Sequence, residues 1–265
     1  QSILVYVIGL GYCMKYLICS GDSFTDHYHR SQPHPEMDTS WPKWPELLGK
    51  KLNMKVINVG GSGQGNEYIY STIQDAIEGI EDKNQIGMVI AGWSQCQRRD
   101  YQTALGHFDG NRGGWNADPI YKKGNIFGWV KKSLRLFKNL EYMCKYYDIP
   151  YIQFQMIPLF IDYLKRNTTH TTTAGDEYKG IYEEDYNIIL KMILDYDKII
   201  DTSKFIGWPS IGELGGFSFN YELLGDTVGS DKDQYEYGFT ISEEDNHPNA
   251  AGQIKIAEYL YDRLG

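Results

Sequence analysis

Short apolar runs alternate along the chain with longer segments in which apolar residues recur every three or four positions. The short runs predict β-strands and the longer segments predict amphipathic helices. The predicted strands are residues 15–19, 54–60, 86–93, 150–157 and 198–201. The predicted helices are residues 44–53, 66–80, 126–149, 182–196 and 249–264. Strands separated by helices of this length predict parallel β–α–β units and a three-layer α/β/α sandwich with a central, mainly parallel sheet.

Three stretches interrupt this alternation, and we interpret them as insertions in one domain that covers residues 14–265. They are about residues 99–125, 166–176 and 207–244. Long insertions in a compact domain are usually functional loops. Residues 1–13 are apolar and precede Met14, which we take as the native start; the alternative is an extra edge strand.

Composition narrows the class of protein. A hydrophobic content of 42% and a charged content of 23% are typical of a soluble globular domain. The net charge of −9 argues against a nucleic-acid partner, because phosphate binding needs clustered Lys and Arg. The apolar start is too short to span a bilayer and makes a poor signal peptide, so we expect no membrane partner. The four cysteines match no zinc or CxxC spacing, and we expect no structural disulfide.

The first predicted strand ends in Gly21-Asp22-Ser23. These are turn-forming residues, so the triplet has a purely structural interpretation, in which Asp22 bonds backbone amides of the turn. In a parallel α/β sheet, however, ligands bind beyond the carboxyl ends of the strands. The alternative interpretation is therefore that Ser23 is a nucleophile at the edge of the sheet.

A serine nucleophile needs a base, and His247 is the best candidate among six histidines. It lies in "SEEDNHPNAAGQ", just before the last predicted helix and after three acidic residues at 243–245. A carboxylate at this distance can fix the tautomer of the imidazole. The histidines at 27, 29 and 34 lack the regular spacing of a helix face, so we expect no metal site, and no other cofactor is indicated.

Two further turns offer donors for a developing oxyanion. "NVGGSGQGNEY" (58–68) follows the second strand and "AGWSQCQR" (91–98) ends the third. A Gly-rich turn at a strand end can instead bind phosphate, as in a nucleotide-binding protein. Here no P-loop lysine follows and no GxGxxG is completed, so that alternative is weak.

Taken together, these stretches resemble the conserved blocks of the SGNH (GDSL) hydrolase family, over roughly residues 15–264. "GDSFTD" resembles the first block, "NVGGSG" the second and "DNHPNAAG" the last. The resemblance implies a flavodoxin-like sandwich and ester hydrolysis without a metal. It implies that Ser23 is the nucleophile, that His247 is the base, and that the amides of Ser23 and Gly63 bind the oxyanion.

The chain departs from the family pattern at two points. The third block usually carries an asparagine two residues after its glycine, and here "GWS" places Ser94 there. We expect Ser94 to take over as the third oxyanion donor; the alternatives are that Gln95 or Arg98 reaches in, or that activity is low. "GWSQCQR" looks like a variant of phage-encoded members, in which Arg98 belongs to the pattern. The triad acid is Asp245 or, by the commoner spacing, Glu244; we favour Asp245.

The resemblance therefore predicts a serine esterase acting on a small-molecule or polysaccharide ester, with carbohydrate O-acetyl esters as the favoured substrate class. Asp22, Trp93 and Arg98 are candidate substrate-binding residues. The alternative function is a weakly active or inactive SGNH module that binds carbohydrate or forms part of a virion or cell surface. The altered third block motivates that alternative.

Overall fold

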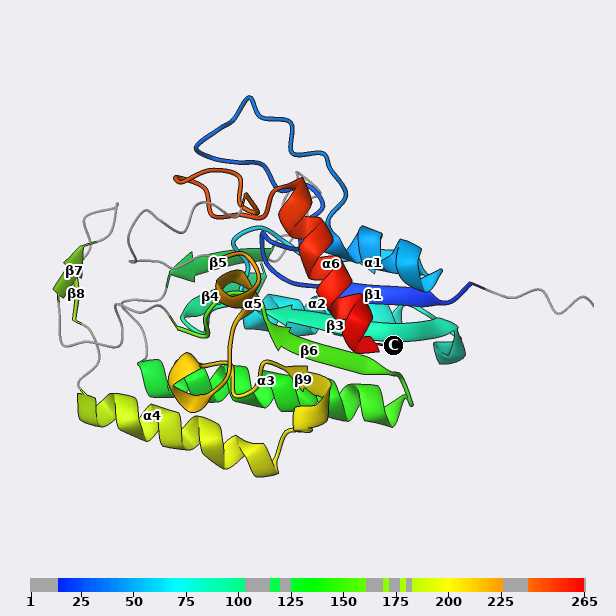
Figure 1. Ribbon diagram of the computed structural model, residues 1–265. Coiled ribbons are helices and arrows are strands. Elements are labelled where there is room, and N and C mark those ends of the chain that lie inside the picture. Colours follow the sequence, from blue (N-terminus) through cyan, green and yellow to red (C-terminus); the bar gives the residue numbers. More distant parts are fainter. Residues whose placement is uncertain are drawn as a thin grey trace, which may run out of the picture.

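The computed structural model describes residues 14–102, 115–119, 125–160, 169–171, 177–179, 183–225 and 238–264. Its centre is a sheet of five parallel strands in the order β2-β1-β3-β6-β9 (Figure 1). The strands are β1 (Tyr16–Ser20), β2 (Lys55–Asn58), β3 (Ile86–Trp93), β6 (Tyr151–Gln155) and β9 (Phe205–Ile206). The predicted α/β class is confirmed.

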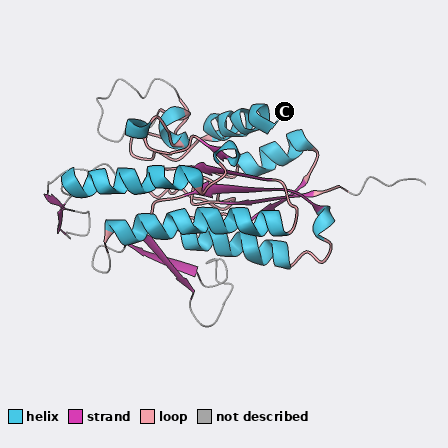
Figure 2. Cartoon of the chain, turned by 90° about the horizontal axis from the view of Figure 1, so that it is seen from below, coloured by secondary structure: helices cyan, strands magenta, loops and turns pink. Residues whose placement is uncertain are grey.

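Helices cover both faces of this sheet (Figure 2). They are α1 (Trp44–Leu52), α2 (Asn66–Glu78), α3 (Ile126–Tyr146), α4 (Glu183–Asp195), α5 (Phe219–Glu222) and α6 (Ala250–Leu264). Helices α2, α3 and α4 share one buried apolar cluster with the sheet, whereas α1, α5 and α6 share the other. The result is the three-layer sandwich that the alternating pattern predicts.

The alternation of side chains along the strands explains the two clusters. Leu17 and Cys19 of β1 face α1 and α6, whereas Ile18 between them faces α2. Successive strand residues point to opposite faces of a sheet, so a strand covered on both sides reads as a continuous apolar run. This is why the strand signals in the sequence are short unbroken runs rather than alternating patterns.

The predicted strand at 198–201 is wrong. Residues Tyr196–Lys198 form a 3-10 turn, and the fifth strand of the sheet is β9, which pairs with Gln153 and Phe154 of β6. Ile200 packs into the buried core and Ile199 is exposed, and neither residue belongs to a strand. Strand β9 is two residues long, too short to produce a periodic signal.

Two predicted insertions contribute small antiparallel hairpins. Strands β4 (Arg98–Gln102) and β5 (Trp115–Pro119) pair at the first, and β4 begins one residue before the predicted start of that insertion. Strands β7 (Thr169–Thr171) and β8 (Glu177–Lys179) pair at the second, and β8 lies just beyond its predicted end. Residues 1–13, with Cys13, lie outside the described residues. The other three cysteines are buried free thiols. None of the described helices has the length and hydropathy needed to cross a membrane.

Candidate active site

Four turns meet at the carboxyl edge of the sheet and surround a cavity of about 980 Å³. They follow β1, β2 and β3 and precede α6, so each arises where a strand ends or a helix begins. The cavity is lined by Ser23, Asp26, Tyr28, His29, Arg30, Gln32, Pro33, Gly61, Ser62, Gly63, Gln64, Tyr68, Arg98, Glu244, Asp245, Asn246 and His247. Most of these side chains are polar, which suits a hydroxylated or charged ligand.

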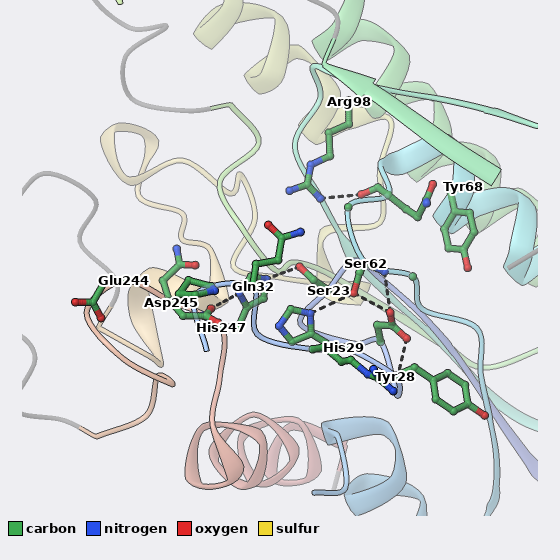
Figure 3. A pocket seen from close by; sticks show the side chains of 17 residues that line it. Ser23, Tyr28, His29, Gln32, Ser62, Tyr68, Arg98, Glu244, Asp245 and His247 are labelled. Atoms are coloured by element: carbon green, nitrogen blue, oxygen red, sulfur yellow. Dashed lines mark hydrogen bonds and ion pairs between the residues drawn. The ribbon is translucent and has the colours of Figure 1, made fainter. Parts of the chain in front are cut away.

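Ser23 and His247 meet in this cavity although 224 positions separate them in the chain (Figure 3). Ser23 Oγ lies 2.7 Å from His247 Nε2, and His247 Nδ1 lies 2.5 Å from Asp245 Oδ1. Because a carboxylate only accepts hydrogen bonds, Nδ1 carries the proton and Nε2 is the acceptor for the serine hydroxyl. This arrangement of hydroxyl, imidazole and carboxylate is that of a serine–histidine–acid triad.

The loop that carries His247 is fixed at both ends. Ile241 N donates to His247 O at 2.9 Å, which closes the loop back on itself. At the far end, Asn249 Oδ1 accepts from Gly252 N at 3.0 Å and caps the start of α6. The position of the imidazole is therefore set by backbone contacts and a helix cap.

Asp245, not Glu244, is the acid that reaches His247. Burial acts to raise the pKa of the Asp245 carboxyl, but the hydrogen bonds from His247 and Ser31 outweigh it and hold the pKa well below its ordinary value. The Glu244 side chain is 67% exposed, bonds Ser242 Oγ and lies 3.8 Å from His34. In Figure 3 it lies at the outer edge of the site, away from the imidazole.

Ser31 is a further partner of the acid, one that sequence reasoning missed. Its hydroxyl donates to Asp245 Oδ2 at 2.5 Å, and Ser31 itself is buried. The same Oγ accepts from His34 N at 3.1 Å, which fixes the loop after Ser23. Both oxygens of Asp245 therefore have partners, and the plane of the carboxylate is set.

Replacing Ser31 by alanine is expected to lower kcat/KM for an ester substrate by about tenfold. In the wild type, the Ser31 hydroxyl stabilises the charged form of Asp245. Without that hydroxyl, the pKa of the Asp245 carboxyl rises toward its ordinary value. On the acid side, activity should consequently be lost at a higher pH than in the wild type. A pH–rate profile measures both effects, and Ser31→Thr, which keeps the hydroxyl, should restore the wild-type profile. An S31A profile that superimposes on the wild type would show that the contact is only structural.

His29 stacks on the imidazole of His247, with ring centroids 4.0 Å apart and an interplanar angle of 27°. Ser62 Oγ donates to Asp26 Oδ2, so it accepts from His29 Nδ1 at 3.2 Å. Burial, followed by the neighbouring His247, lowers the pKa of His29 to about 4. At neutral pH His29 is therefore an uncharged ring that, together with Phe24, packs against the imidazole of His247.

Three potential metal ligands come together among the described residues, namely His29, Asp245 and His247. Both nitrogens of His247 and both oxygens of Asp245 already have hydrogen-bond partners in the triad and Ser31. The histidines at 27, 29 and 34 instead contact three different groups, Glu46, Ser62 and Ser242. The atoms of His247 and Asp245 that could bind an ion thus already have hydrogen-bond partners, and the absence of a metal site stays a prediction.

The backbone amides of Ser23 and Gly63, both at the cavity, have no partner among the described residues. Gly63 has φ of +75°, a left-handed conformation that glycine adopts without strain. It lies on the exposed turn after β2, and both residues line the same cavity. Unpaired amides beside a serine hydroxyl are the donor type that an oxyanion requires.

Ser94, the predicted third oxyanion donor, does not reach the cavity, and that prediction is wrong. It is fully buried, and its hydroxyl donates to Asp22 Oδ2 at 3.0 Å and accepts from Arg98 Nη1 at 3.0 Å. A hydroxyl has one proton, and this one is used. Asn66 holds the backbone of Ser94 on both sides, accepting from its N at 2.7 Å and donating to its O at 3.0 Å.

Asp22 and Trp93, named as possible substrate contacts, are also inaccessible to a ligand in the cavity. Trp93 is fully buried, packs on Phe137 and donates from Nε1 to Gln153. Asp22 is fully buried too and accepts from Phe24 N, which matches its predicted role in the turn. Burial raises the pKa of Asp22, and the Arg98 guanidinium is the strongest opposing influence. Of the three predicted contacts, only Arg98 lines the cavity.

The start of α2 depends on a residue of the first predicted insertion. Asp100 accepts from Gly65 N at 2.6 Å and from Tyr68 N at 3.0 Å, which satisfies free amides at the helix N-terminus. Gly65 has no room for a side chain, because a Cβ there would lie 2.7 Å from Arg98 Cβ. No local pattern predicts these contacts, because Asp100 lies more than 30 positions along the chain from the amides that it bonds.

Neither a protein-family model nor a curated protein sequence matches the chain. Solved structures of similar fold include a protein assigned to the G-D-S-L lipolytic family from Desulfitobacterium hafniense, with 17% identity and a TM-score of 0.48. That alignment covers 94% of this chain and 99% of the other. Esterase EstA from a Pseudoalteromonas species has 13% identity and a TM-score of 0.43, covering 94% and 96% of the two chains. An acetylxylan esterase from Geobacillus stearothermophilus has 14% identity and a TM-score of 0.42, covering 95% and 94%.

Proposed function

We propose that this chain is a serine hydrolase of the SGNH type that cleaves carboxylic esters through an acyl-serine intermediate. The observation that supports this most is the continuous chain of hydrogen bonds from Ser23 through His247 to Asp245 at the wall of a cavity. The two unpartnered amides beside it complete the set of groups that acyl transfer requires.

In the first half-reaction, Ser23 Oγ attacks the ester carbonyl and its proton passes to His247 Nε2, 2.7 Å away. Asp245 keeps the imidazole in the required tautomer and stabilises the positive charge that forms on it. The amides of Ser23 and Gly63 donate to the oxygen that becomes negative. Collapse of the tetrahedral intermediate expels the alcohol, which takes the proton back from Nε2.

In the second half-reaction, water enters where the alcohol left and gives one proton to His247 Nε2 as its oxygen attacks the acyl carbon. The intermediate collapses, the carboxylic acid leaves, and Ser23 Oγ regains the proton. Throughout, His247 stacks on His29 and contacts the ring of Phe24, so it can act first as base and then as acid without changing orientation.

The lining of the cavity favours a hydroxylated alcohol over a lipid. Tyr28, Gln32, Gln64 and Arg98 offer donors and acceptors around the triad. With the family resemblance, this supports a carbohydrate carrying short acyl groups, acetyl above all, as the substrate class. Short acyl chains need only a small apolar pocket, and few aliphatic side chains line this cavity.

The experiment that tests the proposal combines labelling and turnover. A fluorophosphonate probe should modify the protein at a single serine, and peptide mapping should locate the adduct at Ser23. The protein should also hydrolyse p-nitrophenyl acetate faster than it hydrolyses long-chain p-nitrophenyl esters. A chain that is neither labelled nor active on any ester would contradict the proposal and favour the alternative of a non-catalytic carbohydrate-binding module.

A further inference from the structure

Arg98, at the start of β4, is anchored between the two turns that carry the unpartnered amides. Its Nη1 donates to Gln64 O at 2.9 Å, next to Gly63, and to Ser94 Oγ at 3.0 Å. The same nitrogen lies 3.7 Å from Asp22 Oδ2, next to Ser23. Gln64 and Asp22, which hold the guanidinium, are thus each one residue away from one of these amides. In Figure 3 the Arg98 side chain points toward the Gly-rich turn that contains Ser62.

The buried residues beneath Arg98 hold it in this position. Ser94 is fully buried, and its hydroxyl bridges the guanidinium to the carboxylate of Asp22. Asn66 and Gln155 in turn fix the backbone of Ser94. A planar guanidinium held by such a network is preorganised, since its position does not depend on the substrate.

Part of the guanidinium remains available to a ligand. It has five N–H groups, and the two on Nη1 account for the hydrogen bonds just described. Within the part of the chain that the structure describes, the other three make no hydrogen bond. The side chain is 23% exposed, and Arg98 lines the cavity that holds Ser23.

We propose that Arg98 is a catalytic residue that supplies the third oxyanion donor, in the place that the third-block asparagine occupies in related proteins. This inference rests on the proposed esterase function. When Ser23 Oγ bonds to the carbonyl carbon, the π electrons of the carbonyl move to its oxygen, and the serine proton moves to His247. The resulting oxyanion accepts from the amides of Ser23 and Gly63 and from a free N–H of Arg98. Arg98 transfers no proton, because a guanidinium stays charged in proteins.

Placing the donor on Arg98 explains the direction of the Ser94 hydroxyl. If Ser94 were the oxyanion donor, its hydroxyl would have to break its hydrogen bond to Asp22 Oδ2. Asp22 would then keep only the hydrogen bond that its other oxygen accepts from the Phe24 amide. In the observed arrangement Ser94 positions Arg98, and Arg98 carries a full positive charge toward the oxyanion. A charged donor forms a stronger hydrogen bond to an anion than a neutral hydroxyl does.

The test compares Arg98→Gln, Arg98→Lys and Ser94→Ala on p-nitrophenyl acetate, with thermal unfolding to establish that each variant is folded. R98Q should lower kcat by about 10²–10³-fold while KM stays within about threefold, because the lost interaction forms mainly in the transition state. R98K should fall between R98Q and the wild type. S94A, which removes only the tether, should lose about tenfold or less. Arg263→Gln, an exposed arginine on α6, is the matched control and should behave as the wild type.

Chemical rescue separates catalysis from a structural role. Arg98→Gly leaves space for a free guanidinium ion, and added ethylguanidinium should raise its kcat at least tenfold without changing that of R263Q. The proposal is overturned if R98Q or R98K keeps the wild-type kcat, if S94A loses more activity than R98K, or if folded R98G is not rescued. If R98Q does not fold, the comparison of kcat between R98K and S94A tests the proposal instead. A wild type that is neither labelled nor active would instead overturn the esterase proposal.

Discussion

Replacing Ser23 by alanine is expected to reduce kcat for p-nitrophenyl acetate by about 10⁴-fold or more, with no labelling by a fluorophosphonate. This hydroxyl forms the acyl bond in the proposed mechanism, and the imidazole that takes its proton is 2.7 Å away. Residual activity should remain above the rate in water, since the amides at Ser23 and Gly63 and the cavity are still present. Steady-state kinetics with active-site titration of the wild type provides the measurement.

The substitution should leave the fold unchanged. Ser23 is a small residue on a turn, and its hydroxyl bonds only His247 among the described residues. The melting temperature of S23A should therefore lie within a few degrees of the wild type. Ser203→Ala, an exposed serine in a 3-10 turn, serves as the control and should retain full activity. Equal turnover by S23A and the wild type would refute the assignment of the nucleophile.

Asp245→Asn is expected to lower kcat by about 10³–10⁴-fold, the second largest effect that the site predicts. The amide would present an N–H or a weaker acceptor to His247 Nδ1, so the tautomer with a free Nε2 would lose its main stabilisation. The positive charge formed on the imidazole would also lack its counter-ion. KM should change much less, because Asp245 acts through His247 rather than on the ester itself.

Glu244→Gln is the matched comparison, since it makes the same chemical change one residue away. Its carboxylate is exposed and bonds Ser242, so we expect kcat within about threefold of the wild type. The pair of variants decides between the two acids that the sequence leaves open. A large loss in E244Q together with a small one in D245N would reverse the assignment.

Every described helix except the four-residue α5, and four of the five sheet strands, could be predicted because each depends on a local periodicity. Strand β3 has the predicted bounds, and the five predicted helices differ from the observed ones by at most three residues at either end. The exception is β9, whose two residues join the sheet only through pairing with β6. The position of β9 depends on this pairing, and no local sequence pattern predicts it.

The residues of the candidate site also fall into those that the sequence could predict and those that it could not. Ser23, His247 and the Gly-rich turn are marked by residue type next to a strand end or a helix start, so the sequence alone could nominate them. Whether Asp245 or Glu244 bonds the imidazole depends on how the loop closes, which a spacing of one residue does not determine.

The sequence by itself determined the layer architecture, the edge of the sheet where chemistry could occur, and the serine and histidine that would carry it. Only the tertiary structure decided that Ser94 and Trp93 are buried, that Ser31 bonds Asp245, and that Arg98 is anchored to the turns after β1 and β2. The physical reason is that a hydroxyl or guanidinium takes its role from the partners around it. Those partners, such as Asp22 for Ser94 and Gln64 for Arg98, come from other strands and turns.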